Sequence, residues 1–325
     1  MARSSFTPSD QIIVLGGTGF VGRSLVAELV KRHVKVRVLV RDRAKVSSLS
    51  QILGDIEVVE GDVLTGKGLS EALQGTHTAF YLIHSMGGKS LFTNTEFASQ
   101  DRAAAAHFVK AADSADLKRV IYLGGLGEEG IELSEHLSSR VEVGKILATG
   151  KAGATILRAA VIIGAGGASF EMLRHLVERL PVMVCPRWVE TRIQPIALWD
   201  VIGYLVGCLF NADTTGQTFD IGGTEILTYR EMMQQYASAR GLARRIILVV
   251  PFLTPLLSAY WVDLMTPIPS GIAHPLIEGM KNEVICRENR IDEYVAIQKT
   301  SFREAVMLAV SKGKSGLEAQ EEHGR

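Results

Sequence analysis

The sequence predicts a doubly wound α/β fold, with helices on both faces of a parallel sheet. Over the first 160 residues, short β-branched runs alternate with helix-length amphipathic stretches. The runs are almost continuously apolar, as strands are when both sheet faces are buried. We expect strands at Gln11–Leu15, Lys35–Val40, Ile56–Glu60, Thr78–Ile83, Arg119–Leu123 and Ala154–Leu157, and helices that begin near Phe20, Ala44, Lys67, Asn94 and Ser134.

The alternation changes after about Gly164. Eight of the nine prolines lie from residue 181 onward, and longer irregular segments separate the helical stretches. Thr228 and Glu231 have the spacing of a capping box, which predicts a helix start. We expect a first domain over 10–164, a C-terminal substrate lobe with interleaved strands over 165–310, and a disordered tail over 311–325. The expected helices of the lobe are Ser169–Glu178, Leu198–Phe210 and Tyr229–Arg240.

Composition excludes several classes of protein. Lys plus Arg equals Asp plus Glu at 35 each, so no global field favours nucleic acid. Three cysteines are too few and too dispersed for a disulfide framework or a zinc site, and no other metal spacing is evident. The N-terminus lacks the apolar core of a signal peptide. We therefore expect reduced thiols and a cytoplasmic protein, whose oligomeric state the sequence does not indicate.

Residues 246–262 form an apolar run that raises the question of a membrane segment. Pro251 and Pro255 interrupt it, and it is shorter than the roughly 20 residues of a spanning helix. We interpret it as a buried or pocket-lining segment and expect no transmembrane helix. Peripheral contact with a bilayer surface stays open.

A glycine-rich turn is the strongest motif in the chain. The expected strand Gln11–Leu15 runs into Gly16, Gly17, Thr18, Gly19, Phe20, Val21 and Gly22, and an amphipathic helix follows. Glycines allow the tight turn and the close approach of a pyrophosphate, whose charge the helix N-terminus stabilises. The motif therefore predicts a dinucleotide site in a Rossmann fold, with the NAD(P)-binding domain over 10–164.

The residues after the second and third strands bear on the choice of dinucleotide. Arg41 follows the second strand, where a guanidinium can pair with a 2′-phosphate. Asp42 can instead bind a ribose hydroxyl, as in NAD proteins. We favour NADP(H) and leave NAD open. After the third strand, Asp62 and Val63 can reach the adenine, or Asp62 can cap the next helix.

These motifs resemble those of the atypical and extended short-chain dehydrogenase/reductase superfamily, in particular its NmrA-like branch. The resemblance spans about residues 10–310 and includes the glycine turn, Leu157-Arg158, Gln194-Pro195-Ile196 and Phe219-Asp220-Ile221. Within that branch, the stretch His84-Ser85-Met86-Gly87 resembles a bacterial subgroup of uncharacterised NAD(P)-binding proteins. It implies a nicotinamide cofactor and leaves the reaction open.

The catalytic Tyr and Lys of that superfamily are replaced here. Their Y-x-x-x-K motif corresponds to His136 and Arg140. Histidine can act as an acid, and arginine can bind the nicotinamide ribose, although both can also be structural. His84, after the fourth strand, is a second candidate acid. Tyr122 lies within a strand and is more plausible as a core residue.

Two classes of function fit this sequence. One is an NADP(H)-dependent oxidoreductase that reduces an apolar or amphipathic carbonyl or alkene, with the proton supplied by His136 or His84. The other is a non-catalytic sensor or assembly factor that binds NADP(H). Large aromatic and apolar residues of the C-terminal lobe predict an apolar substrate pocket, although core packing explains them equally well. They are Trp188, Trp199, Phe252, Leu256, Tyr260, Trp261 and Met265.

Overall fold

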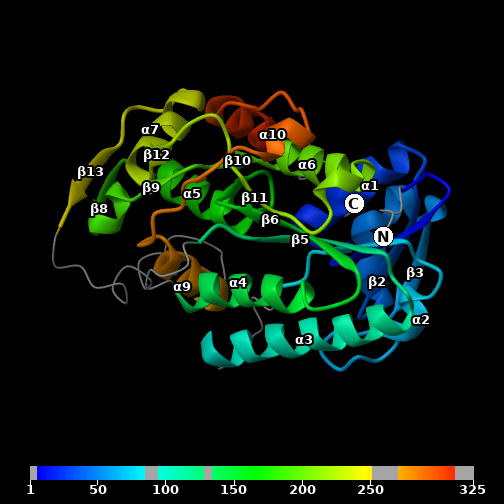
Figure 1. Ribbon diagram of the computed structural model, residues 1–325. Helices are drawn as coiled ribbons and strands as arrows, with labels where there is room; N and C mark the ends of the chain where they lie inside the picture. The colour runs from blue at the N-terminus through cyan, green and yellow to red at the C-terminus, as the bar shows by residue number, and fades with distance from the viewer. Residues whose placement is uncertain (1–5, 85–93, 128–133, 251–269, 312–325) are drawn as a thin grey trace.

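The computed structural model describes residues 6–84, 94–127, 134–250 and 270–311. Its centre is a seven-stranded sheet in the order β11-β6-β5-β4-β1-β2-β3, in which every pairing is parallel (Figure 1). The predicted doubly wound Rossmann fold is therefore confirmed. The strands are β1 Gln11–Leu15, β2 Lys35–Val40, β3 Ile56–Glu60, β4 Thr78–Tyr81, β5 Arg119–Gly125, β6 Gly153–Ala159 and β11 Thr218–Ile221.

Helices cover both faces of this sheet. On one face lie α1 (Phe20–Lys31), the 3₁₀ segment η1 (Arg43–Asp55) and α6 (Leu198–Phe210). On the other lie α2 (Leu69–Leu73), α3 (Asn94–Ser114) and α4 (Glu135–Leu147), with α3 and α4 below the sheet in Figure 1. Successive strand residues point to opposite faces, so each strand supplies side chains to two cores.

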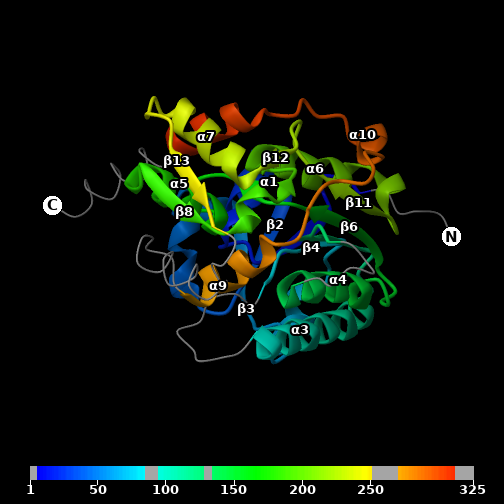
Figure 2. The same ribbon diagram turned by 90° about the vertical axis from the view of Figure 1, so that its left-hand side faces the viewer.

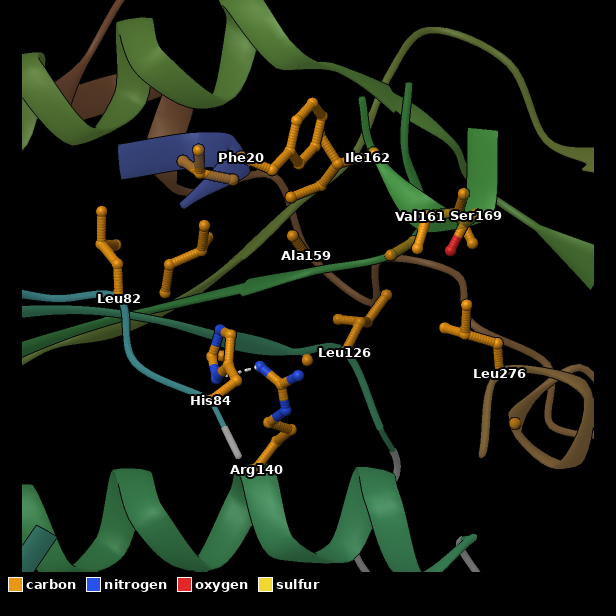
Figure 3. A pocket seen from close by; sticks show the side chains of 18 of the residues that line it. Phe20, Leu82, His84, Leu126, Arg140, Ala159, Val161, Ile162, Ser169 and Leu276 are labelled. Carbon is orange, nitrogen blue, oxygen red and sulfur yellow. Dashed lines mark hydrogen bonds between the residues drawn. The ribbon is translucent and has the colours of Figure 1, made fainter. Parts of the chain in front are cut away.

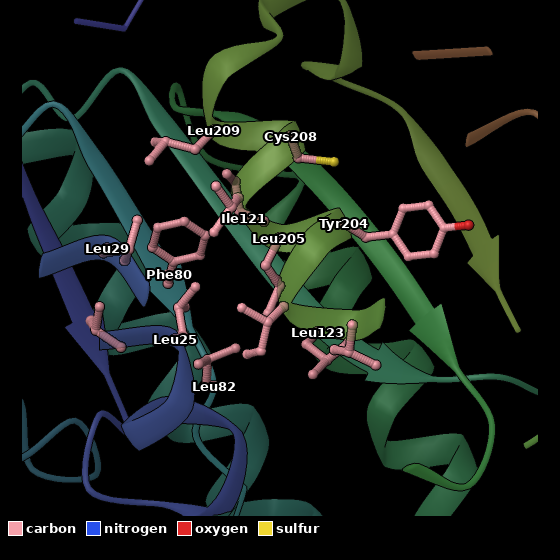
Figure 4. Packing of buried hydrophobic residues seen from close by; sticks show 14 of the residues in the cluster. Leu25, Leu29, Phe80, Leu82, Ile121, Leu123, Tyr204, Leu205, Cys208 and Leu209 are labelled. Atoms are coloured by element: carbon pink, nitrogen blue, oxygen red, sulfur yellow. The ribbon is translucent and has the colours of Figure 1, made fainter. Parts of the chain in front are cut away.

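The core between α1, α6 and the sheet shows this packing directly (Figure 4). Leu25 and Leu29 of α1 meet Phe80 of β4, and all three are fully buried. Leu205 of α6 belongs to the same cluster. The second half of the chain thus helps to build the core of the first, because α6 packs beside α1 on the same face.

The remaining elements form a smaller layer at one end of the sheet. They include α5 (Ala168–Arg179), α7 (Tyr229–Ala239) and α9 (Ser270–Gly279), and a helix over 302–311 packs with them. Three two-stranded sheets complete it: β7 (Ile162–Ile163) with β10 (Ile196–Ala197), β9 (Arg192–Ile193) with β12 (Leu227–Thr228), and β8 (Val182–Cys185) with β13 (Ile246–Val249). Of the short elements, η2 (Arg187–Glu190) lies between β8 and β9 in this layer, whereas η3 (Ala212–Thr214) joins α6 to β11 and α10 (Ile291–Tyr294) packs beside β11.

Most expected elements lie within a few residues of their observed bounds, and one differs in type. The helix expected near Ala44 is a 3₁₀ segment, whose N-cap Asp42 accepts a hydrogen bond from the Ala44 amide. The helix expected near Lys67 begins at Leu69, directly after Gly68 in the left-handed region at φ 73°. The capping box of Thr228 and Glu231 is present at the start of α7.

The apolar run over 246–262 is described only in part. Residues 246–249 form β13, a strand rather than a helix. The interpretation of the run as buried or pocket-lining is wrong for this part, because strand alternation leaves Ile246 and Leu248 exposed. Residues 251–262 lie outside the described residues, as do 312–325 of the expected tail. No helix in the described ranges is long and apolar enough to cross a membrane. The division of the chain at residue 164 stays a prediction.

Candidate functional site

A cavity of about 400 Å³ opens at the carboxyl edge of the central sheet (Figure 3). It lies where the chain leaves β1, β4, β5 and β6, and the N-termini of α1 and α5 border it. Ligands of doubly wound folds bind at this edge, because the loops that leave parallel strands converge there. Of the predicted site residues, Gly16, Gly19, Phe20, Val21, Gly22, His84 and Arg140 line the cavity.

The glycine turn has the close contacts that a dinucleotide-binding turn requires. Gly16 adopts φ 87°, and a Cβ at this position would lie 2.8 Å from the Leu82 carbonyl oxygen. A Cβ on Gly22 would lie 2.1 Å from the Gly16 carbonyl oxygen, so only glycine lets α1 pack against the turn. Gly19 is the N-cap of α1. A Cβ at this position would lie 3.2 Å from the Gly16 carbonyl oxygen, which is close but is not the clash found at Gly22. These residues fit a bound pyrophosphate.

Gly17 and Thr18 belong to the turn without lining the cavity. A Cβ on Gly17 would lie 2.6 Å from Val38 Cγ1, so this glycine allows contact between the turn and β2. Arg41 is exposed at the end of β2, the strand next to β1. Asp42 caps η1, because its Oδ1 accepts a hydrogen bond from the Ala44 amide. The roles expected of Arg41 toward a 2′-phosphate and of Asp42 toward a ribose hydroxyl stay predictions.

Asp62 and Val63 follow β3, one strand further along the same edge. The Asp62 carboxylate accepts a hydrogen bond of 3.0 Å from the Leu64 amide, and Val63 is buried. The alternative of Asp62 as the cap of the next helix is wrong, since Gly68 is the N-cap of α2. Asp62 stabilises the turn that follows β3, and its role toward adenine stays a prediction.

Arg140 and His84 meet inside the cavity. Arg140 Nη1 donates a hydrogen bond to His84 Nδ1, which joins α4 to the segment that follows β4 (Figure 3). Gly125 of β5 packs against α4, since a Cβ there would lie 3.2 Å from Leu137 Cδ2 and 3.4 Å from Arg140 Cγ. Burial lowers the pKa of Arg140, while Tyr122 and Asp101 oppose that shift. Two residues that are 56 positions apart in the chain therefore form one polar pair.

The residues behind this pair are buried and structural. Tyr122 is a core residue, as expected, and its hydroxyl donates to the Arg140 carbonyl oxygen at 3.1 Å. Burial raises the pKa of Tyr122 to about 12, so the phenol stays protonated. Ser139 donates to the buried Asp101 carboxylate of α3 at 3.3 Å, which links α3 to α4. This packing fixes the helix that carries Arg140.

His136 lies on the first turn of α4, four residues before Arg140. Its side chain lies outside the described part of the structure. The role predicted for it in catalysis therefore stays a prediction.

Much of the remaining cavity wall is aliphatic, with glycines between the aliphatic residues and the hydroxyl-bearing Ser169 of α5 among the lining residues. Residues that sequence reasoning did not single out as lining include Leu126 after β5, Val161 and Ile162 after β6, and Leu276 of α9. The structure describes two aromatic residues of the predicted pocket, Trp188 and Trp199, and neither lines this cavity. Trp188 packs edge-on against Tyr229 with ring centroids 5.9 Å apart, and Trp199 is partly exposed. The other five residues of that predicted pocket lie outside the described residues.

Comparison with known families agrees with this geometry. Residues 16–162 match a family described as NAD(P)H-binding, a range that runs from the glycine turn to the strand after β6. The chain therefore contains an NAD(P)H-binding domain, and the predicted nicotinamide cofactor is confirmed at this level. The NmrA-like branch stays a prediction.

Individual relatives are more distant. The chain is 23% identical over 223 residues to the mitochondrial NADH dehydrogenase (ubiquinone) 1 alpha subcomplex subunit 9 of Arabidopsis thaliana, covering 68% of this chain and 56% of that protein. It is 28% identical over 172 residues to the ceramide reductase of Caulobacter vibrioides, covering 53% of this chain and 52% of that protein. The chain thus spans about half the length of these curated relatives.

The fold recurs in solved structures of other proteins, among them a nucleoside-diphosphate-sugar epimerase of Staphylococcus aureus with a TM-score of 0.73 and 17% identity. The triphenylmethane reductase of Citrobacter sp., solved in complex with NADP(H), matches with a TM-score of 0.70 and 20% identity. The match covers 92% of this chain and 99% of that protein. The likeness therefore includes the smaller layer as well as the NAD(P)H-binding domain.

Proposed function

We propose that this protein is an NADP(H)-dependent reductase of an apolar carbonyl compound or a carbonyl-conjugated alkene. The observation that carries the proposal is the Arg140–His84 hydrogen bond in a cavity that the glycine turn also lines. Aliphatic side chains form much of the remaining wall, which favours an apolar substrate. The similarity to proteins named as reductases supports the same class of reaction.

The Arg140–His84 hydrogen bond determines which nitrogen of the His84 imidazole carries the proton. A guanidinium carries only donors, so His84 Nδ1 accepts the hydrogen bond and the ring proton is on Nε2. A neutral imidazole in this state can donate from Nε2 to a substrate oxygen and stabilise the negative charge that develops on it. In this scheme His84 takes the place of the superfamily's tyrosine, and water protonates the product oxygen.

The remaining residues would hold the cofactor, which supplies a hydride when bound. The backbone of Gly16–Gly22 would bind the pyrophosphate, and the exposed Arg41 would bind the 2′-phosphate. Arg140 has further N–H groups beyond the one that binds His84, so it can also hold a ribose hydroxyl. Arg140 thereby links cofactor binding to the orientation of His84.

A second function is favoured by a specific observation. Tyr and Lys are absent from positions 136 and 140, and one relative is named as a subunit of NADH dehydrogenase rather than as a reductase. In this alternative the protein binds NADP(H) without turning over a substrate.

Turnover measured beside cofactor binding distinguishes the two functions. We would measure NADPH consumption with a panel of apolar aldehydes, ketones and enones, and NADPH affinity by fluorescence titration. His84→Gln should slow turnover roughly 100-fold while NADPH affinity stays within about twofold, because the imidazole acts mainly in the transition state. His175→Gln on α5 is the matched control and should retain turnover, because His175 does not line the cavity. Loss of turnover in His136→Gln with normal turnover in His84→Gln would assign the role to His136 instead. Tight NADPH binding without turnover on any member of the panel would favour the non-catalytic function.

A further inference from the structure

The β8–β13 pair carries an unusual set of exposed apolar side chains. Val182 and Val184 of β8 are 50% and 55% exposed, and Ile246 and Leu248 of β13 are 55% and 52% exposed. Residues between them on the same strands are buried against the lobe, as strand alternation requires. We call the four exposed side chains the β8–β13 face.

Strand register makes this face continuous. Ile246 pairs with Val182 and Leu248 with Val184, so the side chains form two adjacent rows. Single exposed apolar residues are ordinary on protein surfaces, whereas a contiguous group indicates a contact surface. The pair lies at one extremity of the molecule, at the left of Figure 1 and far from β3. None of the four residues lines the cofactor cavity.

Basic side chains lie at both ends of the face. Arg244 lies just before β13 and Arg187 just after β8, and because the strands are parallel these positions are at opposite ends. Both side chains are exposed, and neither forms an ion pair or hydrogen bond with any residue that the structure describes. Two nearby acidic residues are neutralised, since Glu190 pairs with Arg230 and Glu178 with Arg174 and Arg240. A third, Glu231, borders the same groove as Arg244 and is engaged in the capping box of α7.

We propose that the β8–β13 face docks onto a bilayer surface that contains anionic phospholipid. The four apolar side chains would enter the interface, and the two guanidiniums would bind lipid phosphates. A second copy of this chain is a poorer partner, because pairing two such faces would bring four arginines together without compensating carboxylates. The proposal does not depend on the proposed reaction, since cavity and face share no residue.

Vesicle sedimentation tests this docking on the full chain. Vesicles of phosphatidylcholine alone would be compared with vesicles that contain a quarter phosphatidylglycerol. The unmodified protein should sediment with the anionic vesicles and be released by high salt. Ile246→Thr with Leu248→Thr should lower the partition coefficient at least about tenfold, because threonine keeps the strand but not the apolar surface. Arg187→Gln with Arg244→Gln should lower it roughly fivefold for each arginine, and only on anionic vesicles.

The control removes the same amount of apolar surface elsewhere. Met307 and Leu308 are 53% and 45% exposed on the helix over 302–311, and Met307→Gln with Leu308→Gln should bind vesicles normally. Circular dichroism and thermal melting establish that each variant is folded. The proposal is overturned if the unmodified protein binds neither vesicle, or if the control loses binding equally. Light scattering that shows a dimer dissociated by the Ile246 and Leu248 changes would identify a second copy as the partner instead.

Discussion

The two ends of the cavity differ in how strictly the backbone determines which residues can occupy them. At the glycine turn, backbone geometry leaves no choice of residue: Gly16 has a positive φ, and Gly22 has no room for a Cβ. At the α4 end, His84 and Arg140 meet through flexible side chains from two distant segments. The glycine turn follows from residues that are close together in the sequence. The contact between His84 and Arg140 forms only when two distant segments fold together. The glycine turn is therefore a feature of the fold, whereas the polar pair depends on two side chains that other residues could replace.

Gly22→Ala should have the largest effect, because it acts on the part of the site that backbone geometry fixes. The new Cβ would meet the Gly16 carbonyl oxygen at 2.1 Å, which forces α1 away from the turn. We expect NADPH affinity to fall roughly 1,000-fold, since several contacts to the pyrophosphate are lost together. Titration of NADPH fluorescence measures this. Gly54→Ala is the matched control, as a Cβ there meets nothing within 4 Å, and a Gly22→Ala protein with normal affinity would contradict the described turn.

Arg140→Met tests the other end. It removes both the contact to His84 and the proposed contact to the ribose, so turnover should fall roughly 100-fold and NADPH affinity about tenfold. Arg140→Lys restores the superfamily's residue and should recover most of the affinity but little turnover, because lysine lacks the guanidinium fork. Arg102→Met serves as control, since Arg102 pairs with Glu142 at the surface of the same two helices. If Arg140→Met and Arg102→Met have the same turnover and the same NADPH affinity, Arg140 has a structural role only.

Arg41→Ala should have a smaller and more selective effect. A charge-assisted contact to the 2′-phosphate contributes about 1.5–3 kcal/mol, so NADPH affinity should fall roughly ten- to 100-fold while NADH affinity is unchanged. Arg43→Ala tests a neighbouring arginine that instead binds the Val58 carbonyl oxygen at 3.3 Å. Equal affinities for NADPH and NADH in the unmodified protein would show that Arg41 does not select the cofactor.

Local signals explain which parts of the fold the sequence predicts. The apolar strands and the start of α1 follow from short-range patterns, and their bounds agree closely with the structure. The start of α2 agrees to within two residues, and Gly66 and Gly68, both at positive φ, mark the turn before it. Helix type was wrong at η1, where an amphipathic pattern fits 3₁₀ turns as well as an α-helix.

The candidate site is predictable only in part, for a related reason. The sequence identifies His84 and Arg140 separately, but their hydrogen bond depends on how α4 packs beside the end of β4. Leu276 and Val284 complete the cavity from more than 100 residues away, and no periodicity reports such a contact. Conversely, the scarce aromatic residues suggested a pocket, whereas Trp188 packs within the lobe. Long-range packing decides which apolar residues line a cavity.

The tautomer of His84 tests the central claim of this account most directly. Nuclear magnetic resonance of protein labelled with ¹⁵N-histidine distinguishes the two neutral tautomers from the imidazolium, and His84→Gln identifies the signal. At pH 7 we predict a neutral His84 with its proton on Nε2, because Arg140 donates to Nδ1. This state should be lost in Arg140→Met and kept in Arg102→Met. A proton on Nδ1, as in the other tautomer or the imidazolium, would contradict the Arg140–His84 pair and the role proposed for it.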